Sequence, residues 1–126
     1  MRLEFLQGAE PETGGAGVIR LGHFSPEEAV LLQALLANLA SGAVSEVAVH
    51  ELPFVEAAGG CRLTLRVLSW DQAVHFKSKP YDFECGFTTG TWDNVAGLVE
   101  PFTHRAAGFQ WLAGGEAQLV LTPRSI

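Results

Sequence analysis

The sequence predicts an α+β domain in which an antiparallel sheet of about seven to eight strands carries two helices on one face. Residues 25–41 and 91–102 predict the helices, because each segment joins a capping hydroxyl to apolar side chains at helical spacing. The remaining segments alternate apolar and polar residues between turns rich in glycine, proline and aspartate, which is typical of strands. A chain of 126 residues is the size of one domain, so we expect residues 1–126 to share a single core.

The first predicted helix, residues 25–41, is the most apolar part of the chain. Ser25 suits the N-cap, because its hydroxyl accepts from the free amides of the first turn, and Gly42 suits the end of the helix. From the second turn onward, only Gln33 and Asn38 interrupt the run of apolar residues as far as residue 40. A helix of this kind is normally covered on more than one side, so the pattern favours contacts beyond a single sheet.

Strands are predicted on both sides of each helix. Thr91 caps the second helix and Pro101 ends it. Residues 8–17 are rich in glycine and form a flexible loop between the first two strands. The predicted strands are residues 2–7, 18–23, 47–55, 61–69, 73–77, 81–88, 108–112 and 117–122.

The order of these elements divides the chain into two half-repeats, residues 2–69 and 73–122. In each half, two strands precede a helix and a hairpin with a glycine pair follows it, Gly59-Gly60 or Gly114-Gly115. Residue identity between the halves is slight, so a duplicated ββαββ unit is a hypothesis that competes with coincidence. Different strand orders around the two helices would contradict it.

The composition excludes several classes of function. Fourteen acidic residues against eight lysines and arginines give a formal net charge of −6 without a basic stripe, so no nucleic-acid partner is expected. The chain shows neither a secretory signal nor an apolar run of membrane-spanning length, so we expect a cytoplasmic protein without membrane contact. Cys61 and Cys85 lack metal-type spacing and are expected as buried hydrophobes, and no metal or cofactor is predicted.

One polar row is predicted across the strands on the sheet face opposite the helices. If the strands form a meander, pairing residue 52 with 64, 66 with 75 and 75 with 84 aligns His50, Arg66, His75 and Glu84. Two imidazoles, a guanidinium and a carboxylate on a rigid sheet can bind an anion or perform acid–base chemistry. The competing interpretation is a set of ordinary cross-strand pairs that stabilises a solvated sheet face.

Aromatic residues supply further candidates for partner contacts. Trp70, in the turn 69–72, is the aromatic side chain expected to be most exposed, and Phe54 lies beside the polar row. Trp92 and Trp111 are expected in the core, with a pocket between the second helix and the last hairpin as the alternative.

The chain contains no catalytic motif, so we interpret it as a non-enzymatic protein-interaction module that binds another protein or forms a homodimer. The apolar first helix and the mixed apolar and charged sheet face support this interpretation. The alternative is a binder of a small anionic ligand, or a small acid–base enzyme, that uses the polar row. A concave pocket around His50, Arg66, His75 and Glu84 would favour the alternative, and a flat sheet face would favour the interaction module.

Overall fold

The computed structural model describes residues 1–7, 17–78 and 81–124, so the loop predicted for residues 8–17 lies, apart from Gly17, outside the described residues. Two helices, α1 (Pro26–Ser41) and α2 (Thr89–Val99), alternate with strands, and none of the described helices is long and apolar enough to cross a membrane. The strands are β1 (Arg2–Leu6), β2 (Val18–Gly22), β3 (Glu46–Ala48), β4 (Glu56–Ala57), β5 (Arg62–Val67), β6 (Ala73–Ser78), β7 (Asp82–Phe87), β8 (Gln110–Ala113) and β9 (Gln118–Leu121). Three short 3₁₀ helices complete the described chain: η2 (Val49–Glu51), η3 (Ala58–Gly60) and η4 (Glu100–Thr103).

The α+β class is confirmed, but the single antiparallel sheet is wrong. The strands form two mixed sheets, sheet A in the order β4-β1-β2-β9-β8 and sheet B in the order β3-β5-β7-β6. The pairs β2/β9 and β5/β7 are parallel. The physical reason is that each helix connects one sheet to the other. The chain runs from β2 of sheet A through α1 to β3 of sheet B. It then runs from β7 of sheet B through α2 to β8 of sheet A.

The strand orders of the two halves correspond. In the hypothesis of duplication, β1, β2, β3 and β5 of the first half correspond to β6, β7, β8 and β9 of the second half. Apart from β4, sheet A has the order β1-β2-β9-β8. Replacing each strand by its counterpart gives β6-β7-β5-β3, which is the order of sheet B. The parallel pair at the centre of each sheet also corresponds. A duplicated unit predicts this correspondence, and the hypothesis of duplication itself stays a prediction.

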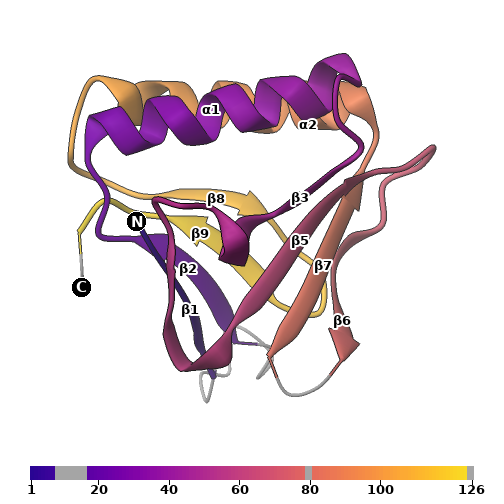
Figure 1. Ribbon diagram of the computed structural model, residues 1–126, viewed down its shortest axis with the longest axis horizontal. Helices are drawn as coiled ribbons and strands as arrows, with labels where there is room; N and C mark the ends of the chain where they lie inside the picture. The colour runs from indigo at the N-terminus through magenta and orange to yellow at the C-terminus, as the bar shows by residue number, and fades with distance from the viewer. Residues whose placement is uncertain (8–16, 79–80, 125–126) are drawn as a thin grey trace.

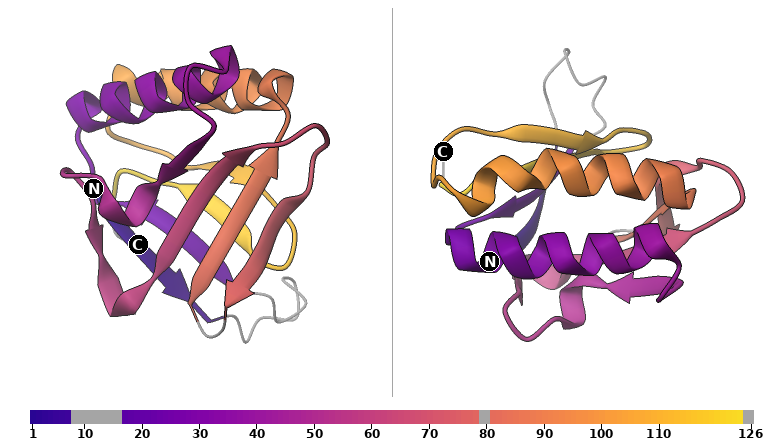
Figure 2. Two further views of the ribbon diagram at one scale, coloured as in Figure 1. Left: turned by 45° about the vertical axis from the view of Figure 1, so that its right-hand side comes forward. Right: turned by 90° about the horizontal axis from the view of Figure 1, so that it is seen from above.

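The two helices lie side by side and cover one end of the two sheets (Figures 1 and 2). Ser25 caps α1 as predicted, since its hydroxyl accepts from the Glu28 amide at 3.2 Å, and Gly42 ends the helix with a φ of 77°. The cap of α2 is Thr88 rather than the predicted Thr91, because the Thr88 hydroxyl accepts from the Thr91 amide at 3.3 Å. Gln33 of α1 donates to the Ala96 carbonyl of α2 at 3.3 Å and so links the helices.

Sheet A and sheet B also contact each other away from the helices. The Val74 amide of β6 donates to the Gly114 carbonyl at 2.9 Å, and the Glu116 amide donates to the Val74 carbonyl at 2.8 Å. Between the sheets, Phe5 of β1 packs its ring against Phe83 of β7 at a centroid distance of 4.8 Å. The core therefore lies between the sheets and under the helices, which leaves the outer face of each sheet and of each helix for function.

Candidate functional site

The predicted polar row is present in part on the outer face of sheet B. His75 and Glu84 are cross-strand partners as predicted, with 3.6 Å between Nε2 and the carboxylate. The predicted pairing of Arg66 with His75 is wrong, because β7 lies between β5 and β6 and runs parallel to β5. Arg66 nevertheless reaches Glu84 at 3.5 Å and Glu46 of β3 at 3.5 Å.

His50 does not belong to this row. The strand predicted over residues 47–55 ends at Ala48, and His50 lies in η2. Its Nδ1 accepts from the Leu63 amide at 3.1 Å, and its Nε2 is buried without a hydrogen-bond partner, 3.8 Å from the Glu51 carboxylate. Residues in a 3₁₀ turn do not alternate between two sheet faces as residues in a strand do. His50 thus anchors η2 to β5.

Glu84 is the centre of the remaining network. Its side chain is only 9% exposed, and it lies between the guanidinium of Arg66 and the imidazole of His75. Its cross-strand neighbour on β5, Thr64, is also buried. None of these residues lines the groove beside α1, the hollow beside β1 or the hollow around Met1. The arrangement is a row of polar and charged side chains across a sheet face, and a role in ligand binding or acid–base chemistry stays a prediction.

Trp70 is exposed, as predicted, with 57% of its surface accessible. The turn that carries it is tied to the start of α2, because the Asp71 carboxylate accepts from the Thr88 amide at 2.9 Å and from the Thr91 hydroxyl at 2.8 Å. The hydrogen bond from Thr88, together with that from Thr91, lowers the pKa of the Asp71 carboxyl below its ordinary value. The turn that carries Trp70 is therefore held against the start of α2.

An apolar groove runs along the outer side of α1. Its volume is about 540 Å³, and it lies between α1 and the segment that follows η2. The lining residues are Leu31, Ala34, Leu35, Asn38, Leu52, Pro53 and Phe54. Leu31 is 48% exposed, and Val30 beside it on the helix is 50% exposed. Phe54, predicted as a partner-binding residue, lines this groove rather than a sheet face.

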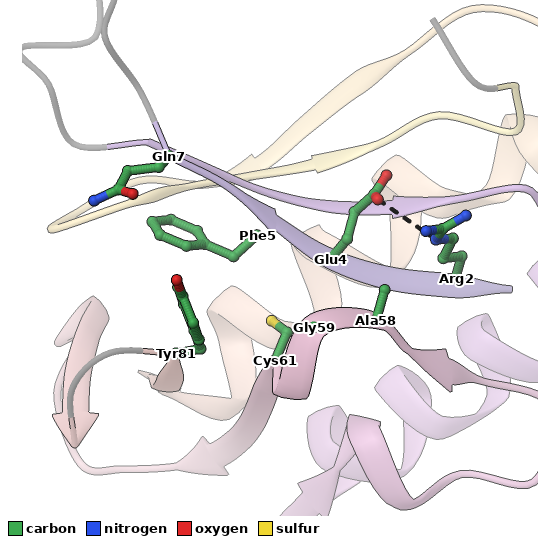
Figure 3. A pocket seen from close by; sticks show the side chains of 8 residues that line it. All are labelled: Arg2, Glu4, Phe5, Gln7, Ala58, Gly59, Cys61 and Tyr81. Atoms are coloured by element: carbon green, nitrogen blue, oxygen red, sulfur yellow. Dashed lines mark ion pairs between the residues drawn. The ribbon is translucent and has the colours of Figure 1, made fainter.

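A second hollow of about 430 Å³ opens beside β1, where β4 pairs only with Arg2 and Leu3. Figure 3 shows the rings of Phe5 and Tyr81 close together at one end, with centroids 5.9 Å apart. At the other end Glu4 forms ion pairs with Arg2 and Arg20. Sequence reasoning missed this site because it joins β1 to residues far along the chain. The Glu4 carboxylate in this hollow is already neutralised by the guanidinium groups of Arg2 and Arg20.

A smaller hollow of about 310 Å³ lies around the start of the chain, lined by Met1, Arg2, His23 and Glu56. The Met1 ammonium donates to the Phe54 carbonyl at 2.9 Å. Within the described residues, no group of three or more histidine, cysteine, aspartate or glutamate side chains is placed to hold a metal ion.

Two aromatic side chains are exposed side by side at the edge of sheet A. Phe109 is 59% exposed and Trp111 of β8 is 47% exposed, and their rings meet edge to face with centroids 6.2 Å apart. The expectation of a core position is therefore correct for Trp92, which is buried, and wrong for Trp111. The reason is that β8 is an edge strand whose outward-facing residues nothing covers in the described chain.

Both cysteines are buried, as predicted, and form no disulfide. Burial raises the pKa of the Cys61 thiol to about 11, with Asp82 and Glu4 adding to the effect. Burial also raises the pKa of the Cys85 thiol to about 12. Neither thiol is a nucleophile at neutral pH, because the reactive thiolate is almost absent.

Comparison with known proteins adds no relative to this description. No family model, no curated protein and no solved structure matches the chain.

Proposed function

We propose that this protein is a non-enzymatic interaction module that binds an amphipathic helix of another protein in the groove beside α1. The observation that carries the proposal is the groove itself, in which all lining side chains except Asn38 are apolar although Leu31 is half exposed. Exposed apolar surface of this kind marks interaction sites. A helix presents apolar side chains along one stripe, which suits an elongated apolar groove.

The charges around the groove indicate the kind of helix. Neither α1 nor residues 49–57 contain a lysine or an arginine. Glu27 lies one helical turn before Leu31, and Glu51 directly precedes Leu52 of the groove. The rim is therefore acidic, and the complementary occupant is a helix with lysine or arginine flanking its apolar stripe. A second copy of this chain would bring two acidic rims together, so a foreign helix is favoured over the homodimer.

A designed peptide tests the proposal. The probe is a synthetic helix with leucine at helical spacing and lysine at the remaining positions, titrated into the full chain and followed by fluorescence anisotropy. The expected result is saturable binding that Leu31→Glu weakens by at least about tenfold, because it places a charge in the apolar groove. Ala37→Glu is the matched control, since Ala37 is an exposed residue of α1 that does not line the groove.

Two results would overturn the proposal. One is binding that Leu31→Glu leaves unchanged or strengthens to the same extent as Ala37→Glu, which would indicate attraction of the cationic peptide to the net negative charge alone. The other is a dimer, detected by light scattering across a range of dilutions, that Leu31→Glu dissociates. That result would make a second copy of this chain the occupant of the groove.

A further inference from the structure

We infer that the free edge of β8 binds an extended acidic segment of a partner protein, which adds one strand to sheet A. This site is separate from the proposed helix groove, because β8 and α1 belong to different parts of the surface and share no lining residue. The inference depends on three features of β8: its open backbone, its exposed aromatic pair and its flanking arginines.

The backbone of β8 offers hydrogen-bonding groups to an incoming strand. Among the described strands of sheet A, β8 is the last one and pairs with β9 alone. Alternate residues of an antiparallel strand turn both backbone groups away from the partner strand. The Trp111 carbonyl accepts from the side chain of Gln110 at 3.0 Å, so Trp111 is such an outward-turned residue. An amide of an incoming strand can replace the Gln110 side chain as the donor to the Trp111 carbonyl.

Edge strands are usually protected against pairing by lysine, proline, a bulge or a covering segment. Residues 109–113 contain no lysine and no proline. The ladder with β9 is irregular between Trp111 and Ala113, which limits the open edge to the start of β8. The unprotected stretch is therefore Phe109 to Trp111, the same residues that carry the exposed rings.

The aromatic pair supplies contact area for the side chains of the added strand. Trp111 lies on β8 and Phe109 directly precedes the strand, and the contact between their rings places both side chains on the same side of this edge. Their edge-to-face contact, with an interplanar angle of 81°, fixes each ring against the other. Aromatic side chains held in this way lose little conformational entropy on binding, which makes them effective anchors.

The charge near this edge is positive although the whole chain is acidic. Arg124 donates to the Ala106 carbonyl at 3.1 Å, and the Arg105 guanidinium lies over the Phe102 ring at 5.9 Å. Among the residues that the structure describes, neither arginine has a carboxylate at ion-pair distance, whereas Arg2, Arg20, Arg62 and Arg66 each have at least one. Two arginines without a carboxylate partner, on the segments beside the start of β8, complement a segment that carries aspartate or glutamate.

Isotope-labelled full-length protein tests the inference by NMR titration. The probe is a synthetic peptide in which valine and glutamate alternate. The expected result is saturable shifts of the backbone amides from 109 to 111 and slower hydrogen exchange of the Trp111 amide, because that amide donates to the added strand. A peptide of the same length with lysine in place of glutamate should bind at least about tenfold more weakly.

Two protein variants make the test specific. Phe109→Ser with Trp111→Ser should weaken binding by at least about tenfold, whereas Trp70→Ser, at an equally exposed aromatic residue outside β8, should not change it. Leu31→Glu should also leave binding unchanged, so failure of the helix groove is distinguishable from failure of this site. Equal binding of the lysine peptide, or an equal loss in Trp70→Ser, would overturn the inference.

Discussion

Glu28 connects the start of the chain to the start of α1. Its carboxylate accepts from the Met1 ammonium at 2.7 Å and from the Ser25 amide at 3.1 Å. Burial raises the pKa of Glu28, but the Met1 ammonium and the hydrogen bonds with Ser25 together lower it by more, so the pKa lies below its ordinary value. A group with a lowered pKa in the folded state stabilises the fold above its unfolded pKa, and this contribution is lost as the pH falls through the folded pKa.

Glu28→Gln therefore tests an electrostatic contribution at a single residue. The variant keeps an oxygen for the capping box but loses the charge opposite the Met1 ammonium, so we expect it to lower the free energy of unfolding near pH 7 by about 1 kcal/mol. The difference from wild type should shrink at acidic pH, as the pH falls through the lowered pKa of the Glu28 carboxyl. Urea unfolding at both pH values measures it, with exposed Glu27→Gln as the control. A difference that is the same at both pH values would contradict the electrostatic explanation.

The cysteines give a second prediction at this scale. Near pH 8, a pKa of about 11 leaves only about one thiol in a thousand ionised at Cys61, and the fraction at Cys85 is smaller still. We expect the native protein to resist a thiol reagent for hours and the urea-denatured protein to react at both positions, as absorbance of the released thiolate would show. Fast reaction of one thiol in the native protein would reveal local opening around it.

At the scale of elements, Gly115 joins β6 to the turn between β8 and β9. Its φ is 135°, and an added Cβ would overlap the Val74 carbonyl oxygen, which belongs to the backbone and cannot turn away. We expect Gly115→Ala to destabilise the protein by more than about 2 kcal/mol, measured by chemical unfolding. Gly114→Ala is the matched control, because its Cβ would meet only the movable side chain of Gln118 at 3.2 Å. Similar unfolding midpoints for both variants would mean that this contact between the sheets contributes little.

The elements also show what local sequence can and cannot predict. The cap of α1 was predictable because Ser25 is the only capping residue at that point of the chain, whereas Thr88, Thr89 and Thr91 compete at the start of α2. The His75–Glu84 pairing was predictable because only three residues separate β6 from β7, which restricts the registers that the two strands can adopt. The insertion of β7 beside β5 was not, since nothing in either strand encodes which distant strand it meets.

The candidate sites follow the same division. Exposure of Trp70 and the apolar excess of α1 are properties of single segments, and both were predictable from composition and spacing. The groove needs α1 and Phe54 together, and the β8 site needs an edge position that only the complete strand order determines. His50 lies outside its predicted strand, and its ring accepts a hydrogen bond from the Leu63 amide. Such a contact competes with strand pairing, and the alternation of apolar and polar residues cannot predict it.

At the scale of the whole molecule, the two halves depend on each other. Residues 1–69 supply β1, β2 and β4 to sheet A and β3 and β5 to sheet B. Residues 70–126 supply β8 and β9 to sheet A and β6 and β7 to sheet B. Both central parallel pairs, β2/β9 and β5/β7, therefore form between the halves. Neither half alone can close a sheet or cover its helix, so each one exposes the core surface that the other buries.

A split chain tests this dependence. Ser69 and Trp70 are exposed and lie outside the strands, so a protease site between them should leave the cleaved protein folded with both pieces associated. Each piece produced alone should lack the near-ultraviolet circular dichroism of a packed core, and mixing the two should restore it in proportion to complex formed. A native-like spectrum from either isolated piece would contradict the interlocked arrangement. That outcome would also favour a unit that was stable before any duplication, because a repeat that folds alone needs no partner to close its sheet.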